Sequence, residues 1–176
     1  MLSDISNVNN NFDLIPITLA VLIVDFIVIY IAKNTNYFNN EIIVWYEKFG
    51  MTGVLLDVFI IIIGLIITRY VFNYFKLEFT PIKFILVAVG IQLVHDVLLY
   101  KLFIESSTPG SNSIIDIYKT YSMENGAKIL LADAGMIGGA ALIAMYLKNV
   151  ELKNMIAMFF VIIYFIPYVV YQNKLN

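Results

Sequence analysis

The sequence contains no cysteine. Structural disulfides, thiolate catalysis and thiolate metal sites are therefore excluded. Charged residues are also few, at 14% of the 176 residues, and the formal net charge is only −2. Because no basic run is available to bind a phosphate backbone, we expect no nucleic-acid partner.

Cofactor motifs are missing as well. The sequence has no Walker loop, no glycine-rich dinucleotide turn and no selectivity-filter sequence. Lysine is absent from the interior of every predicted membrane span, which excludes a retinal Schiff base. We therefore expect no cofactor, and an enzyme is the least favoured class of function.

Apolar side chains, in contrast, are in excess. They make up 61% of the sequence, against about 45–50% in a soluble domain. A fold of this length cannot hide so much apolar surface from water, so lipid must cover part of it. A membrane-spanning helix needs about 20 apolar residues. Five stretches qualify and predict a single all-α membrane domain over residues 1–176, with spans at 14–32, 53–72, 81–104, 127–147 and 154–171.

The connections between the predicted spans differ in length. Residues 73–80 and 148–153 are short, so the spans that they join are expected to be antiparallel neighbours. The long connections, 33–52 and 105–126, must lie on the same side of the bilayer as the C-terminus. We call this side A and the opposite one side B. Lysine and arginine are distributed almost evenly between the sides, but a lysine-free N-terminal segment favours side A as cytoplasmic.

Each long connection predicts a short amphipathic helix. The first begins at Asn40 and ends at Gly50, and the second begins at Ser111 or Asn112, after the turn at Pro109, and ends at Gly126. These helices either lie on the membrane surface or form a docking surface for a partner. Their aromatic side chains suit the headgroup region and mark the expected interface: Trp45, Tyr46, Tyr118 and Tyr121.

Each of the first four spans carries an aspartate. A charged group at mid-bilayer costs roughly 2.5–3.5 kcal/mol on insertion scales, so these acids should face the bundle interior. The second, third and fourth lie in the side A half of the bilayer, and the third shares its helix face with a glutamine and the only histidine. We call the expected group the polar cluster: Asp25, Asp57, Gln92, His95, Asp96 and Asp133.

Three functions are compatible with the polar cluster. Hydrogen bonds between helices would organise the bundle and give a protein of structural or interaction type. A proton or cation translocator would use the same carboxylates and histidine. A metal-dependent membrane enzyme would need at least three converging ligands, and one histidine with aspartates suits a hard ion better than zinc. The sequence does not identify a metal.

Glycines indicate where helices approach closely. Gly64 lies on the same helix face as Asp57, and Gly135-x-x-x-Gly139, with Gly138, matches the pattern of small residues at helix contacts. Packing within the chain and a homo-oligomer are both compatible with this pattern.

Two segments, IQLVHDVLLY at 91–100 and PGSNSIIDIYKTYSMENGAKILLADAGM at 109–136, resemble a group of uncharacterised multi-pass membrane proteins of nucleocytoplasmic large DNA viruses. The resemblance covers residues 53–147. It implies a component of a virion or virus-factory membrane with a capsid-type protein as partner, and no enzymatic activity. The matching positions are His95, Asp96, Pro109, Asn112, Asp116, Tyr121, Gly126 and Asp133.

Overall fold

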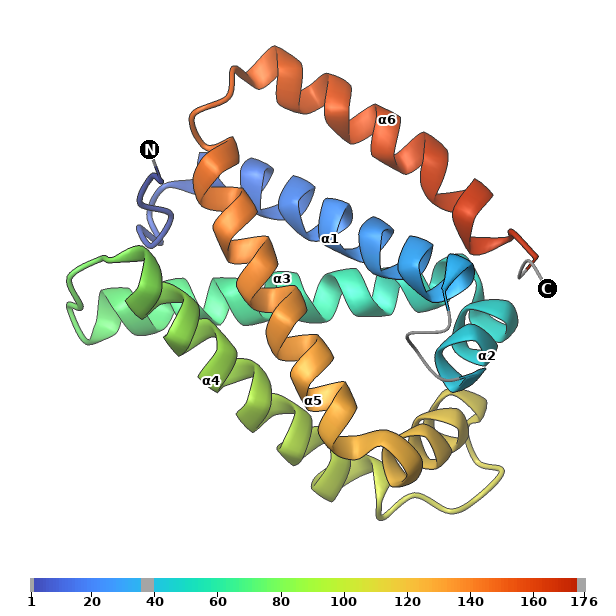
Figure 1. Cartoon of the computed structure of the whole chain (residues 1–176). Coiled ribbons are helices and arrows are strands. Elements are labelled where there is room, and N and C mark those ends of the chain that lie inside the picture. Colours follow the sequence, from blue (N-terminus) through green and yellow to red (C-terminus); the bar gives the residue numbers. More distant parts are fainter. Residues whose placement is uncertain (1, 36–39, 174–176) are drawn as a thin grey trace.

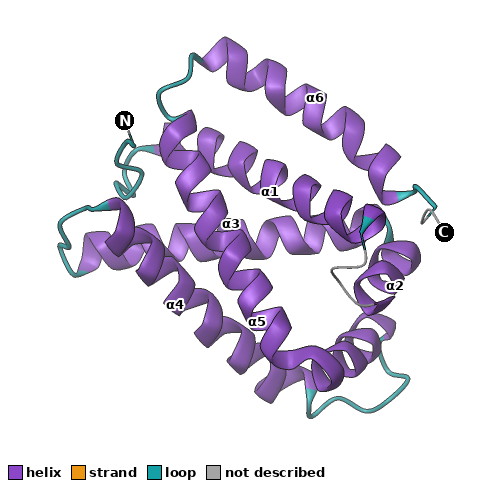
Figure 2. Ribbon diagram, viewed as in Figure 1, coloured by secondary structure: helices purple, strands orange, loops and turns teal. Residues whose placement is uncertain are grey.

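The protein is described by a computed structural model that covers residues 2–35 and 40–173. In this part of the chain the regular secondary structure is helical (Figures 1 and 2). The elements in chain order are η1 (Asn11–Asp13), α1 (Leu14–Asn34), α2 (Asn40–Phe49), α3 (Met51–Tyr74), α4 (Pro81–Leu99), η2 (Tyr100–Ile104), α5 (Ser113–Leu147) and α6 (Leu152–Val170).

Five helical stretches are long and apolar enough to cross a membrane, and each overlaps a predicted span: Asn11–Asn34, Met51–Tyr74, Pro81–Ile104, Lys128–Leu147 and Leu152–Val170. Large apolar side chains such as Phe59, Leu86 and Phe160 point outward and are more than half exposed. Water would not tolerate so much exposed apolar surface, whereas lipid would. The all-α bundle with five candidate spans is confirmed, and it indicates an integral membrane protein in contact with the lipid bilayer.

Helix α1 is the centre of the bundle. It packs against α3, α5 and α6, while α4 packs against α3 and α5. Figure 1 shows α6 lying along the outer side of α1. Small side chains at the centre, including Ala20, Ala140 and Ala144, are completely buried and allow the helix backbones to approach closely.

Local sequence signals set most helix ends. Asn112 caps α5, because its side-chain oxygen accepts hydrogen bonds from the backbone N–H groups of Ile114 (2.9 Å) and Ile115 (3.4 Å). Gly50 follows α2 with φ 51° and ψ −129°, a positive-φ conformation that glycine adopts readily and that ends the helix. Both ends were predicted from the sequence, and both are confirmed.

The predicted end at Gly126 is wrong. Helix α5 runs without interruption from Ser113 to Leu147, so the amphipathic segment and the fourth span form one helix. Glycine ends a helix when it takes a positive φ, and the described glycines with a positive φ are Gly50 and Gly110. Figure 1 shows the first turns of α5, in yellow, running at an angle to the orange remainder. The chain therefore turns by bending one helix instead of by starting a new one.

The structure also places the two long connections at the same end of the bundle, as the directions of the predicted spans require. Helix α2, the first turns of α5 and the C-terminus lie at one end of the bundle, and the N-terminus lies at the other (Figure 1). The rings of Trp45 in α2 and Tyr118 in α5 meet edge to face with centroids 5.5 Å apart. The two long connections are therefore in direct contact on side A.

Candidate functional site: the polar cluster on side A

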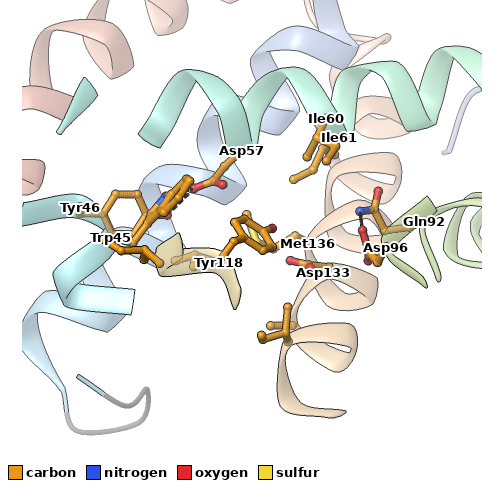
Figure 3. Close-up of a pocket in the computed structure, with 14 residues that line it drawn as sticks. Trp45, Tyr46, Asp57, Ile60, Ile61, Gln92, Asp96, Tyr118, Asp133 and Met136 are labelled. Atoms are coloured by element: carbon orange, nitrogen blue, oxygen red, sulfur yellow. Dashed lines mark hydrogen bonds between the residues drawn. The ribbon is translucent and has the colours of Figure 1, made fainter. Parts of the chain in front are cut away.

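The structure brings most of the predicted polar cluster around one small cavity, which we call the acid cavity (Figure 3). Its volume is about 60 Å³, room for a few water molecules. Asp57 from α3, Gln92 and Asp96 from α4, and Asp133 from α5 line it together with Trp45 and Tyr46 from α2 and Tyr118 from α5.

Asp57 connects α3 to α2. Its Oδ2 accepts hydrogen bonds from the indole Nε1 of Trp45 at 3.2 Å and from the hydroxyl of Tyr46 at 3.0 Å. Gly53, one turn earlier in α3, makes room for the indole, since a Cβ there would lie 2.8 Å from Trp45 Nε1. A hydrogen bond within a protein contributes about 0.5–1.5 kcal/mol, so the two bonds together hold α2 on the bundle.

Asp96 takes its partners from its own helix. Its Oδ1 accepts from Gln92 Nε2 at 2.8 Å and lies 3.0 Å from His95 Nδ1. Gln92 is almost completely buried, whereas the His95 side chain is 38% exposed and lies outside the lining of the acid cavity. Within the described residues the other oxygen, Oδ2, is buried and has no hydrogen-bond partner.

Asp133 and Asp25 differ in whether they line the acid cavity. Asp133 is half-buried, lines the acid cavity and is close enough to Asp96 and Asp57 for their charges to interact. Asp25 is completely buried in α1, beside Asp57 but outside the cavity lining. Neither of its carboxyl oxygens has a hydrogen-bond partner among the residues that the structure describes. A buried carboxyl without a partner is costly, so Asp25 is a candidate for a functional group.

A larger opening adjoins the acid cavity, and we call it the side groove. It has a volume of about 520 Å³ and lies between the end of α4 with η2 and the first half of α5. The groove and the acid cavity share Asp96, Tyr118, Ile129 and Asp133 in their linings. All of these positions belong to the side A half of the bundle.

The metal-ligand geometry that the third hypothesis requires is not found. Within residues 2–35 and 40–173, no three His, Asp or Glu side chains are placed to hold one ion. Asp57 and Asp96 instead accept hydrogen bonds from different partners, and Asp25 has none among the described residues.

The aromatic residues of the expected interface are placed differently from the prediction. Trp45 and Tyr46 are 7% and 2% exposed and turn inward, because their N–H and O–H groups reach the carboxylate of Asp57. Tyr118 is half-buried against Trp45. The side chain of Tyr121 lies outside the described residues. Among the described side chains of α2, those of Val44, Glu47 and Lys48 are exposed on its outward face.

The glycines lie at several contacts within the chain. A Cβ on Gly64 would lie 2.9 Å from Ile137 of α5 and 3.3 Å from the Gln92 side chain. Gly138 faces α4, and Gly139 faces α1, whereas Gly135 has open space beside it. Gly64, Gly138 and Gly139 therefore take part in packing inside the bundle.

A second ionic group, on side B, was missed by the sequence analysis. Asp13, 2% exposed, lies 2.7 Å from Lys148 Nζ and 3.7 Å from the guanidinium of Arg69, which is equally buried. Arg69 also donates to the backbone carbonyls of Asn7 and Asn10. We call this group the side B clasp; it fixes the N-terminal segment over the end of the bundle. Arg69 is the only arginine in the sequence. Its position near the end of a predicted span was the signal that could have indicated this group.

Comparisons with models of protein families, with curated proteins and with solved structures found no match to this chain.

Proposed function

We propose that this is an integral membrane protein of structural or interaction type, in which the polar cluster organises the bundle and presents a fixed surface on side A. The observation that carries the proposal is the pair of hydrogen bonds from Trp45 and Tyr46 to Asp57. Asp57, an acid in a candidate membrane span, therefore binds the amphipathic helix α2 of the same chain.

Further contacts hold α2 in place on the bundle. Trp45 contacts Tyr118 of α5, and Lys33 at the end of α1 is buried and pairs with Glu47 of α2 at 3.8 Å. Helix α2 is thus held by α1, α3 and α5, which leaves Val44 and Lys48 on its outward face. A rigid helix loses little conformational entropy on binding, which favours its use as a docking surface.

The resemblance to membrane proteins of large DNA viruses supports a place in a virion or virus-factory membrane, with a capsid-type protein as the partner on side A. This origin rests on the resemblance alone. The region of resemblance, 53–147, includes Asp57, Asp96 and Asp133 of the polar cluster.

A photo-crosslinking residue in place of Lys48 tests the proposal in purified particles. We expect a crosslink to a shell protein, and we expect Asp57→Ala to reduce it because α2 loses its anchor. A crosslinker in place of Tyr164, 60% exposed on α6, is the control for lipid-facing positions. Crosslinking from both positions alike, or from neither, would contradict a docking surface on α2.

A specific observation also favours a second candidate, a proton or cation translocator. Asp57, Asp96 and Asp133 surround a cavity of about 60 Å³, and Asp25 lies buried beside Asp57 with no hydrogen-bond partner among the described residues. In liposomes containing a pH-sensitive dye, translocation predicts a proton or cation flux above that of empty liposomes, lost on Asp96→Asn. The structural function predicts no flux from either protein.

A further inference from the structure

The side groove has the size and lining of a binding site for a small organic molecule. Its volume of about 520 Å³ lies within the range of about 300–1,000 Å³ that is usual for ligand pockets. Its walls are mainly apolar, with Val97 and Ile104 on one side and Met123 and Leu130 on the other. Where the groove meets the acid cavity, the lining changes to the carboxylates of Asp96 and Asp133.

The ionisable side chains at this inner end are the acids Asp96 and Asp133. Lys101 is the only basic residue in the groove lining that the structure describes, but its Nζ lies 2.9 Å from Glu105 and its side chain is 60% exposed. The charge of Lys101 is therefore neutralised by Glu105, which does not line the groove. Asp133 also lies within reach of the charges of Asp96 and Asp57. An ammonium group at this point would donate hydrogen bonds to Asp96 and Asp133, and its positive charge would favour their ionised forms.

We propose that the side groove binds a lipophilic amine, with the ammonium group against Asp133 and Asp96 and the apolar body along α4, η2 and α5. Charge complementarity selects this class of ligand. A phosphate or carboxylate headgroup would meet acids in place of basic partners at the inner end, and a neutral apolar molecule would leave Asp96 Oδ2 without a hydrogen-bond partner. An alkylamine is protonated at neutral pH, as the lysine side chain is.

Two glycines of α5 provide a matched test of the location. Gly126 lines the groove and a Cβ there would meet open space, so a leucine would extend into the groove without displacing a neighbour. Gly135 has the same open space on the same helix but lies outside the groove lining. Leucine is a good helix former, so either substitution should preserve α5.

The test uses Trp45, the only tryptophan, as a reporter. It lines the acid cavity and contacts Tyr118, which lines both spaces. The probe is 4-(4-bromophenyl)butylamine, whose bromine quenches indole fluorescence at short range, added to the full-length protein in nanodiscs. The control probe is the corresponding alcohol, compared at equal mole fraction in the membrane.

We expect saturable quenching by the amine and only linear, unsaturable quenching by the alcohol. Asp133→Asn should weaken the binding at least about tenfold, the usual cost of removing one partner of a buried charge pair. Gly126→Leu should weaken it similarly, and Gly135→Leu should leave it unchanged. Equal half-saturation by amine and alcohol, or unchanged binding in Gly126→Leu, would overturn the proposal. Gly126→Leu decides the question even where Asp133→Asn fails to fold.

Discussion

Each acid of the spanning helices meets different neighbours. Asp57 accepts two hydrogen bonds from α2, Asp96 accepts from Gln92 of its own helix, and Asp25 has no hydrogen-bond partner within the described residues. The sequence predicts their depth, because helix length and direction determine it. It does not predict their partners, because those depend on the rotation of each helix about its axis. For the same reason the inward orientation of Trp45 was not predicted.

Gly50 supports a prediction at the scale of one residue. Its φ of 51° is strained for any residue with a Cβ, and a Cβ there would lie 2.6 Å from the hydroxyl of Tyr171. We expect Gly50→Ala to lower the free energy of unfolding by about 1–3 kcal/mol. Reversible unfolding in mixed micelles measures this value. Gly135→Ala, in open helical space, should leave stability unchanged or raise it by up to about 1 kcal/mol; equal effects of the two substitutions would refute the reasoning.

At the scale of elements, local signals predict helix starts well and helix ends less well. Asn112 and Pro81 mark starts that the structure contains, because a cap or a proline acts on the first turn of its own helix. Gly126 was expected to end a helix, yet α5 continues to Leu147. A glycine allows a helix to end but does not force it to end. Whether the helix ends there depends on contacts between segments that are distant in the sequence. The side B clasp was missed for the same reason, since it joins residues far apart in the sequence.

The side B clasp supports a prediction for the N-terminal segment. Arg69→Met should release this segment, because Asn7 and Asn10 lose the guanidinium that their carbonyls accept from. Amide hydrogen exchange over residues 3–10 should become faster, and stability should fall by about 1.5–3 kcal/mol, because hydrogen bonds from a charged group are lost while Lys148 still pairs with Asp13. Lys76→Met, at an exposed position on the same side, is the control. Unchanged exchange in Arg69→Met would show that the clasp does not hold the segment.

At the scale of the whole molecule, the five spans produce two unlike ends. Side A carries α2, the first half of α5 and both cavities, whereas side B is closed by the clasp and the N-terminal segment. The number of spans follows from composition and length alone. Orientation does not, because the basic residues are divided almost equally between the two sides.

The absence of cysteine allows this arrangement to be tested directly. Single cysteines in place of Thr108 and Lys76 should react with an impermeant maleimide from opposite sides of a sealed vesicle. A cysteine in place of Asn149 should behave like the one at position 76, because both follow spans that end on side B. Labelling of positions 108 and 76 from the same side would contradict the five-span topology.

The central claim is that an acid inside the bundle fixes the side A helix α2, and Trp45 reports on it. In nanodiscs, Asp57→Ala should shift the tryptophan emission to longer wavelength and accelerate amide exchange in α2 about tenfold or more, since two hydrogen bonds to a carboxylate are lost. Asp57→Asn retains an acceptor oxygen and should show a smaller change, and Glu105→Ala, at an exposed position on side A, should show none. An emission spectrum and exchange rates in Asp57→Ala that match those of the unmodified protein would contradict the account.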